Sequence, residues 1–127
     1  MDDLHLNATR QTPEIDFRFS KHRLGMAGEA YPENAAAFFT PLIHACEAYL
    51  AQSGDAPVTI DLALRYLNSA STKLLFQFIG VFDRVAATGR TVVVEFKHDP
   101  EDDMLIEFAQ DLAADYAWVD VRLVEMA

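Results

Sequence analysis

Hydrophobic and polar positions alternate most regularly over residues 58–67, where every second side chain is apolar or aromatic. A period of two residues predicts a β-strand with one buried face. Over residues 74–86 the apolar side chains instead recur at intervals of three and four, which predicts an amphipathic helix. The polar stretch between them, residues 68–73, is therefore expected to be a strand-to-helix turn.

The same two periods assign most of the remaining chain. Strands are predicted over residues 4–6, 14–19, 24–28, 91–96 and 119–123, and further helices over residues 34–50 and 99–116. Asn34 is the expected N-cap of the first helix, and Pro41 either kinks that helix or begins a shorter one capped by Thr40. Asp99 is the expected N-cap of the last helix, with Pro100 as its first residue. Gly80, inside the middle helix, predicts close packing at that point.

This order of elements predicts the fold class. Residues 1–127 are expected to form one α/β domain with a mixed sheet of four to six strands. Its first part is an antiparallel hairpin, and its second half is a parallel β-α-β-α-β unit, with about three helices flanking the sheet.

Charge narrows the choice of partners. The chain has 20 acidic and 10 basic residues, a formal net charge of −10. Such a surface repels nucleic acid and anionic lipid, and favours a basic patch on a protein partner. Without a membrane-length apolar run or a signal sequence, a soluble cytoplasmic protein is expected, with no membrane insertion. The single cysteine, Cys46, excludes an internal disulfide and is expected to be a buried, inert thiol.

Three hydroxyl side chains crowd the predicted turn at the start of the middle helix. A helix N-terminus presents free backbone N–H groups and favours negative charge. The structural interpretation is that Ser69 or Ser71 caps the helix. The functional interpretation is that a serine accepts a phosphate, with Lys73 close enough to interact with it.

Other polar clusters carry weaker signals for chemistry. His98 with residues 101–103 would suit a small metal-dependent enzyme, but consecutive acids in a first helical turn spread around the axis, so a solvated helix start is favoured. The pairs Asp61–Arg65 and Asp120–Arg122 are interpreted as surface ion pairs. We find no catalytic, metal-binding or cofactor-binding motif in the sequence, and therefore expect no enzyme and no cofactor.

Four segments of the chain resemble the SiaC family of bacterial regulatory phosphoproteins. They are residues 12–17 (TPEIDF), 28–35 (GEAYPENA), 66–73 (YLNSASTK) and 101–104 (EDDM). The resemblance implies a fold similar to that of SpoIIAA-type (STAS-like) anti-sigma factor antagonists. In that fold a mixed sheet is flanked by helices, and a hydroxyl at a strand-to-helix turn is phosphorylated.

The resemblance also implies a phosphorylation site. The acceptor of the family follows the Asn of the turn, which carries over to Ser69, with Ser71 and Thr72 as second choices. Asn68 and Lys73 would then belong to the phosphate and partner surface. Many relatives have threonine followed by serine where this chain has Ser69 followed by Ala70.

Three protein partners are implied by the same resemblance. A Ser/Thr kinase of the histidine-kinase ATPase type adds the phosphate, and a PP2C-type phosphatase removes it. The dephosphorylated protein binds and activates a diguanylate cyclase (a GGDEF protein), whose cyclic-di-GMP favours aggregation and biofilm. The implied function is thus a non-catalytic signalling protein in a partner-switching system. The same switch would also suit an anti-sigma factor antagonist that acts on transcription.

Overall fold

The computed structural model describes residues 1–126, which form a six-stranded sheet and three α-helices. Its elements are β1 (Leu4–Leu6), β2 (Glu14–Arg18), a 3-10 turn (Phe19–Lys21), β3 (Arg23–Ala30), α1 (Ala35–Gln52), β4 (Val58–Leu67), α2 (Ser69–Ala86), β5 (Val92–His98), α3 (Asp103–Asp115) and β6 (Asp120–Glu125). The strands lie in the sheet in chain order. β1, β2 and β3 pair antiparallel, and β3, β4, β5 and β6 pair parallel. The predicted mixed α/β fold is confirmed.

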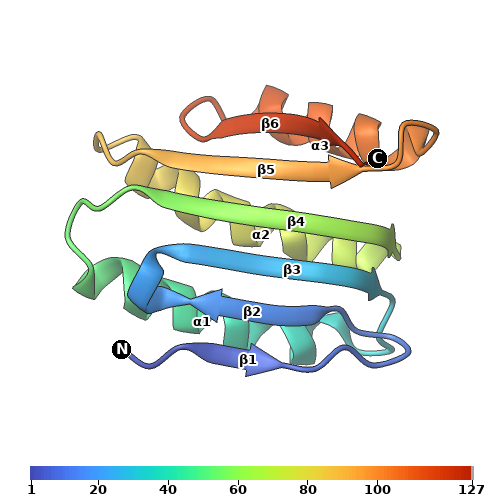
Figure 1. Ribbon diagram of the computed structural model, residues 1–127, viewed down its shortest axis with the longest axis horizontal. Coiled ribbons are helices and arrows are strands. Elements are labelled where there is room, and N and C mark those ends of the chain that lie inside the picture. Colours follow the sequence, from blue (N-terminus) through green and yellow to red (C-terminus); the bar gives the residue numbers. More distant parts are fainter. Residues whose placement is uncertain (127) are drawn as a thin grey trace.

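All three helices cover the same face of the sheet, as Figure 1 shows. Each parallel strand lies next to its predecessor in the same direction, so right-handed crossovers place every helix on one side. The opposite face has no helix above it, which is unusual for parallel strands. Many of its central side chains are accordingly charged or small, as in Arg23, Gly25, Asp61 and Ala63.

The core lies between the sheet and the helices. Along β4, Val58, Ile60, Leu62 and Leu64 are buried, so the predicted alternation is confirmed. Tyr66, in the same register, is 50% exposed because the strand ends there. Cys46 is also buried, and burial raises the pKa of its thiol above the ordinary value, as expected for an inert cysteine.

The glycine in the middle of α2 lies against the loop that precedes β6. A Cβ atom on Gly80 would lie 2.8 Å from the Tyr116 hydroxyl oxygen. That hydroxyl donates a hydrogen bond to the Phe76 carbonyl oxygen at 2.9 Å. The close packing predicted at Gly80 is therefore confirmed.

One predicted helix start is confirmed and one is wrong. Asn34 caps α1 as predicted, and α1 continues through Pro41, so the alternative of a shorter helix that begins at Pro41 is excluded. α3 is capped by Asp102, whose carboxylate accepts from the Leu105 amide at 3.2 Å. Asp99 instead closes the preceding turn. Each Asp is a suitable cap, and the turn between them decides which one is used.

A buried arginine fixes the amino ends of the central strands. Arg90 is only 6% exposed. Its guanidinium donates at 2.8 Å to the carbonyl oxygens of Ala56 and Gly54 and to the hydroxyl oxygen of Ser53. These bonds tie the segment before β4 to the segment before β5.

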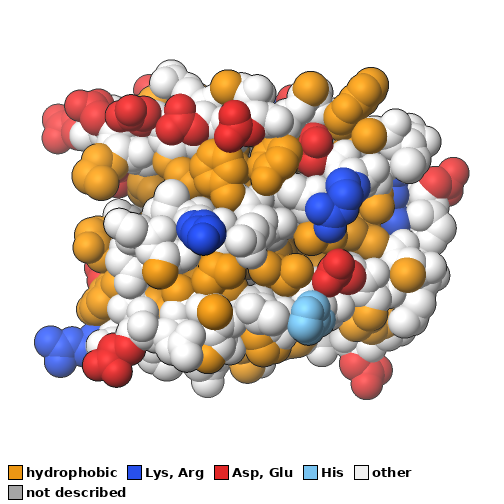
Figure 2. Space-filling model, turned by 180° about the vertical axis from the view of Figure 1, so that it is seen from behind, with side chains coloured by type: hydrophobic (Ala, Val, Ile, Leu, Met, Phe, Trp, Pro, Cys, Tyr) orange, Lys and Arg blue, Asp and Glu red, His pale blue; other side chains and the backbone are white. Residues whose placement is uncertain are grey.

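Charge is distributed unevenly over the molecule. Seen from the helix side, acidic side chains gather along the upper edge, where α3 lies, next to a band of hydrophobic side chains (Figure 2). Within residues 1–126, we find no helix with the length and apolarity that crossing a membrane requires.

Candidate functional site

The turn between β4 and α2 is organised by Asn68. This residue has an extended backbone (φ −77°, ψ 170°), and its side-chain oxygen accepts from the Ser71 amide at 2.9 Å. The backbone N–H of Asn68 donates to the Ala30 carbonyl oxygen at 3.0 Å, which holds the turn against the end of β3. The prediction that Ser69 or Ser71 caps the helix is therefore wrong. Asn caps as well as Ser does, and it occupies the position directly after the strand.

The three hydroxyl residues of the turn have different environments. Ser69 is exposed at the first position of α2. Ser71 is fully buried, and its hydroxyl oxygen has no hydrogen-bond partner within the described part of the chain. Thr72 is half-buried and donates its hydroxyl to the Asn68 carbonyl oxygen at 3.0 Å. Two residues along a helix are about 200° apart around its axis, so Ser69 faces solvent when Ser71 faces the core.

Two features next to the exposed hydroxyl favour an anion. Ser69 lies in the first turn of an 18-residue helix, where the helix dipole favours an anion. Lys73 lies one turn further along the same face and is exposed. None of the ion pairs formed by residues 1–126 includes Lys73. A phosphate on Ser69 would thus find both a helix N-terminus and an unengaged ammonium group.

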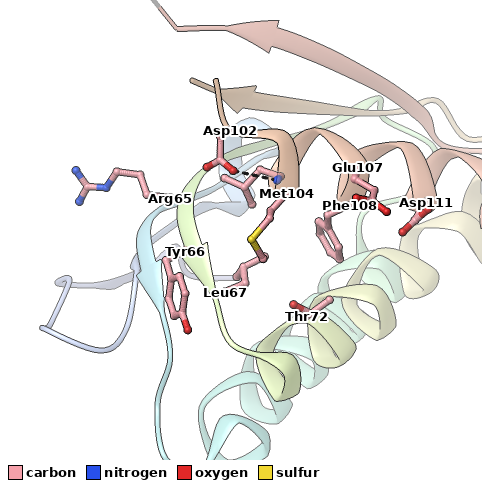
Figure 3. A pocket seen from close by; sticks show the side chains of 10 residues that line it. Arg65, Tyr66, Leu67, Thr72, Asp102, Met104, Glu107, Phe108 and Asp111 are labelled. Atoms are coloured by element: carbon pink, nitrogen blue, oxygen red, sulfur yellow. Dashed lines mark hydrogen bonds between the residues drawn. The ribbon is translucent and has the colours of Figure 1, made fainter. Parts of the chain in front are cut away.

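A groove runs beside this turn, between the end of β4, the first turns of α2 and the helix α3 (Figure 3). Its volume is about 250 Å³. Its lining residues are Arg65, Tyr66, Leu67, Thr72, Asp102, Met104, Leu105, Glu107, Phe108 and Asp111. Met104, which is 76% exposed, reaches across toward Leu67, and Thr72 lies on the wall formed by α2. Ser69 does not line the groove itself, but it follows the lining residue Leu67 by two positions and precedes the lining residue Thr72 by three, so it lies in the turn beside the groove.

A row of acidic side chains, which we call the acidic row, follows the exposed side of α3. It consists of Asp103, Glu107, Asp111 and Asp115, spaced four residues apart and all exposed. Within the part of the chain that the structure describes, no salt bridge includes any of them. Two of the four, Glu107 and Asp111, also line the groove. This row was not predicted, although its four-residue spacing is visible in the sequence.

The other predicted polar clusters lie away from this site or do not converge. His98 is buried, with Nδ1 2.9 Å from the Asp99 carbonyl oxygen. Among residues 1–126 no three His, Cys, Asp or Glu side chains come together as metal ligands would. The predicted pair Asp120–Arg122 is confirmed at 2.8 Å.

The other predicted ion pair, Asp61–Arg65, is wrong. Asp61 pairs across the strands with Arg23 of β3 and with Lys97 of β5, at 2.9 Å for the latter. Cross-strand neighbours lie closer than residues four apart along one extended strand. Burial raises the pKa of the Asp61 carboxyl, but the hydrogen bonds from Lys97 and Arg23 outweigh burial, and the pKa falls below its ordinary value.

Comparison with known proteins assigns the family. Residues 6–126 match the model of the SiaC family regulatory phosphoproteins. The chain therefore belongs to the SiaC family. It is also 33% identical over 115 residues to an uncharacterized protein of Pseudomonas aeruginosa (strain UCBPP-PA14), a match that covers 91% of this chain and 90% of that protein.

Solved structures of SiaC from Pseudomonas aeruginosa have the same fold. One SiaC structure superposes with a TM-score of 0.90 at 29% identity, covering 99% of this chain and 100% of the other. Apo-SiaC gives a TM-score of 0.87 at 31% identity, covering 96% of this chain and 99% of that one. A third structure is the diguanylate cyclase SiaD in complex with its activator SiaC, with a TM-score of 0.86 at 29% identity over 96% of this chain and 100% of the matched chain.

Proposed function

We propose that this chain is a non-catalytic activator of a diguanylate cyclase and that phosphorylation of Ser69 switches its binding off. The observation that carries the proposal is that Ser69 is exposed in the turn beside the groove. Membership of a regulatory phosphoprotein family and similarity to SiaC bound to the cyclase SiaD support the choice of partner.

The environment of each hydroxyl supports Ser69 as the phosphoacceptor. A kinase must reach the oxygen that it modifies, and the Ser71 oxygen is fully buried. The Thr72 hydroxyl is engaged with the Asn68 carbonyl oxygen and is half-buried. Because Asn68 caps the helix, Ser69 has no capping role to lose when it is modified.

Phosphorylation is proposed to change binding rather than folding. A phosphoserine carries a charge of about −1.5 to −2, which a helix N-terminus and Lys73 accommodate without unfolding the domain. In an interface, the same charge must be desolvated, and without a partner that costs several kcal/mol. A loss of about 3 kcal/mol would weaken binding more than a hundredfold.

The proposed system has two modifying enzymes besides the cyclase. A Ser/Thr kinase of the histidine-kinase ATPase type would add the phosphate to Ser69, and a PP2C-type phosphatase would remove it. The chain and both enzymes are proposed to act in the cytoplasm. The exposed position of Ser69 leaves its oxygen open to each enzyme.

The test combines binding with activity. The cyclase of the same organism is titrated with the wild-type chain, Ser69→Ala and Ser69→Asp, and cyclic-di-GMP formation is measured in parallel. Ser69→Ala should bind and activate like the wild type, whereas Ser69→Asp should bind at least about tenfold more weakly. Thr88→Asp, which adds the same charge after the far end of α2, is the matched control and should bind normally.

A second measurement tests the position of the phosphate. With the kinase and ATP, intact-protein mass should show one added phosphate on the wild type and on Ser71→Ala. Ser69→Ala should stay unmodified. Phosphate uptake by Ser69→Ala at the wild-type rate would show that the acceptor is another residue.

A further inference from the structure

The negative charges of the acidic row of α3 are not paired with any lysine, arginine or histidine side chain within residues 1–126. Like charges four residues apart on a helix repel one another, and the row contains three such pairs. The wider stretch, residues 99–120, has eight acidic residues and no lysine or arginine. The acidic residues of this stretch are Asp99, Glu101, Asp102, Asp103, Glu107, Asp111, Asp115 and Asp120. Solubility alone does not require eight of the 20 acids in one stretch.

The acidic row also borders exposed apolar side chains. Met104 on α3 is 76% exposed, and Tyr66 across the groove is 50% exposed. Leu67 and Phe108 form apolar surface between them, as Figure 3 shows. An apolar groove with one acidic wall has the composition of a protein-binding surface for a segment with one apolar and one basic side.

We propose that the groove binds a protein segment that is apolar on one side and carries lysine and arginine on the side facing α3. This inference rests on the proposed function, because it specifies the surface of the partner that the groove recognises. The basic side chains of the segment would supply the cations that α3 lacks. An acidic peptide, a nucleic acid or an anionic lipid surface would be repelled by the same row.

The length of the acidic row sets the length of the segment. Asp115 lies twelve positions after Asp103, so the row extends over about 18 Å at the helical rise per residue. A segment that matches it needs about three helical turns, or five to six residues of strand. The recognised segment is therefore a continuous stretch rather than a single basic side chain.

The arrangement gives the two sides of the groove different roles. Ser69 adjoins the apolar residues at the end of β4, and the acidic row lies on α3. A phosphate on Ser69 would therefore meet the apolar side of the bound segment, where it must be desolvated. The basic side of the segment would still face α3, which accounts for an inhibitory phosphate on a surface that prefers a basic partner.

The experiment neutralises part of the acidic row in the full chain. The variant carries Glu107→Gln, Asp111→Asn and Asp115→Asn, and keeps Asp103, which favours the start of α3. The affinity for the cyclase is measured over a series of salt concentrations. Wild-type binding should weaken steeply with salt, and the variant should bind at least tenfold more weakly at low salt, with little salt dependence. Its thermal midpoint should not fall, because neutralisation removes repulsion.

A matched control distinguishes the effect of removing charges from the acidic row from the effect of lowering the net charge of the protein. Asp2→Asn, Glu47→Gln and Asp55→Asn remove the same number of charges at exposed sites outside the groove. This control should bind like the wild type. Equal binding by the row variant and the wild type at every salt concentration would overturn the inference while leaving the cyclase as the partner.

A peptide arm tests the inference even if the cyclase does not bind. Two synthetic amphipathic peptides share one leucine face and carry either lysine or glutamate on the other. NMR spectra of the protein should show chemical-shift changes at the backbone amides of Leu67 and Met104 when the lysine peptide is added, and no such changes when the glutamate peptide is added. Absence of these shifts, or equal shifts with both peptides, would overturn the inference. Failure of the cyclase to bind the wild-type chain would instead contradict the proposed function.

Discussion

The two ends of the parallel strands are built differently. At the amino ends, Arg90 is buried and donates three hydrogen bonds of 2.8 Å to the loop before β4. At the carboxyl ends, Ser69, Tyr66 and Met104 are exposed around a groove. Figure 1 shows that the arrowheads of β3, β4 and β5 point to this second end.

The difference indicates a division between stability and binding. Buried polar bonds concentrate at the amino ends, where their loss leaves unpaired groups. Near Ser69 the turn is fixed by Asn68, so the exposed residues beside it carry little of the folding free energy. A charge can then be added at the carboxyl end without unfolding the sheet.

The largest effect on stability is expected at Arg90. In Arg90→Met the partly buried carbonyl oxygens of Ala56 and Gly54 lose their donor, and each such loss costs up to about 1–3 kcal/mol. We expect a drop of about 2–4 kcal/mol in the free energy of unfolding, measured by urea denaturation monitored by circular dichroism. Arg90→Lys should recover part of this loss because one ammonium group reaches fewer acceptors. A decrease below about 1 kcal/mol in Arg90→Met would contradict a stabilising role for this end.

A smaller loss of stability is expected from a substitution where α2 packs against the loop before β6. In Gly80→Ala, the new Cβ would lie 2.8 Å from the Tyr116 hydroxyl oxygen. The resulting overpacking costs about 1–3 kcal/mol, and the higher helix propensity of alanine returns about 1 kcal/mol. Introducing Tyr116→Phe removes the nearest atom, so Gly80→Ala should cost less in that background. A double-mutant cycle of urea midpoints measures the coupling, and additive effects would contradict the predicted clash.

Most of the fold could be predicted because its signals are local. The alternation in β4 and the three-and-four spacing in α2 each identify a buried face within ten to eighteen residues. Helix starts were harder, because Asn68 and Ser69, or Asp99 and Asp102, are all suitable caps. Only the turn geometry distinguishes between neighbouring candidates.

The site was predicted in part, for the same reason. The turn sequence identified the region of Ser69, but the groove depends on α3 packing beside the end of β4, which no local pattern encodes. The structural role of Arg90 could not be predicted either, because the three hydrogen-bond acceptors of its guanidinium lie 34 to 37 residues earlier in the chain. The acidic row was readable from its spacing, and only its place beside the groove required the structure.

The smallest effect on stability is expected at the carboxyl end itself. Met104 is 76% exposed, so Met104→Gln removes little buried surface and keeps a good helix former in α3. The free energy of unfolding should change by less than about 0.5 kcal/mol. Binding to the cyclase should weaken about tenfold, because Met104 would lose its contact with the apolar side of the bound segment. Calorimetric titration beside urea denaturation measures both quantities on one preparation. A loss of stability comparable to that of Arg90→Met, with binding intact, would reverse the roles assigned to the two ends.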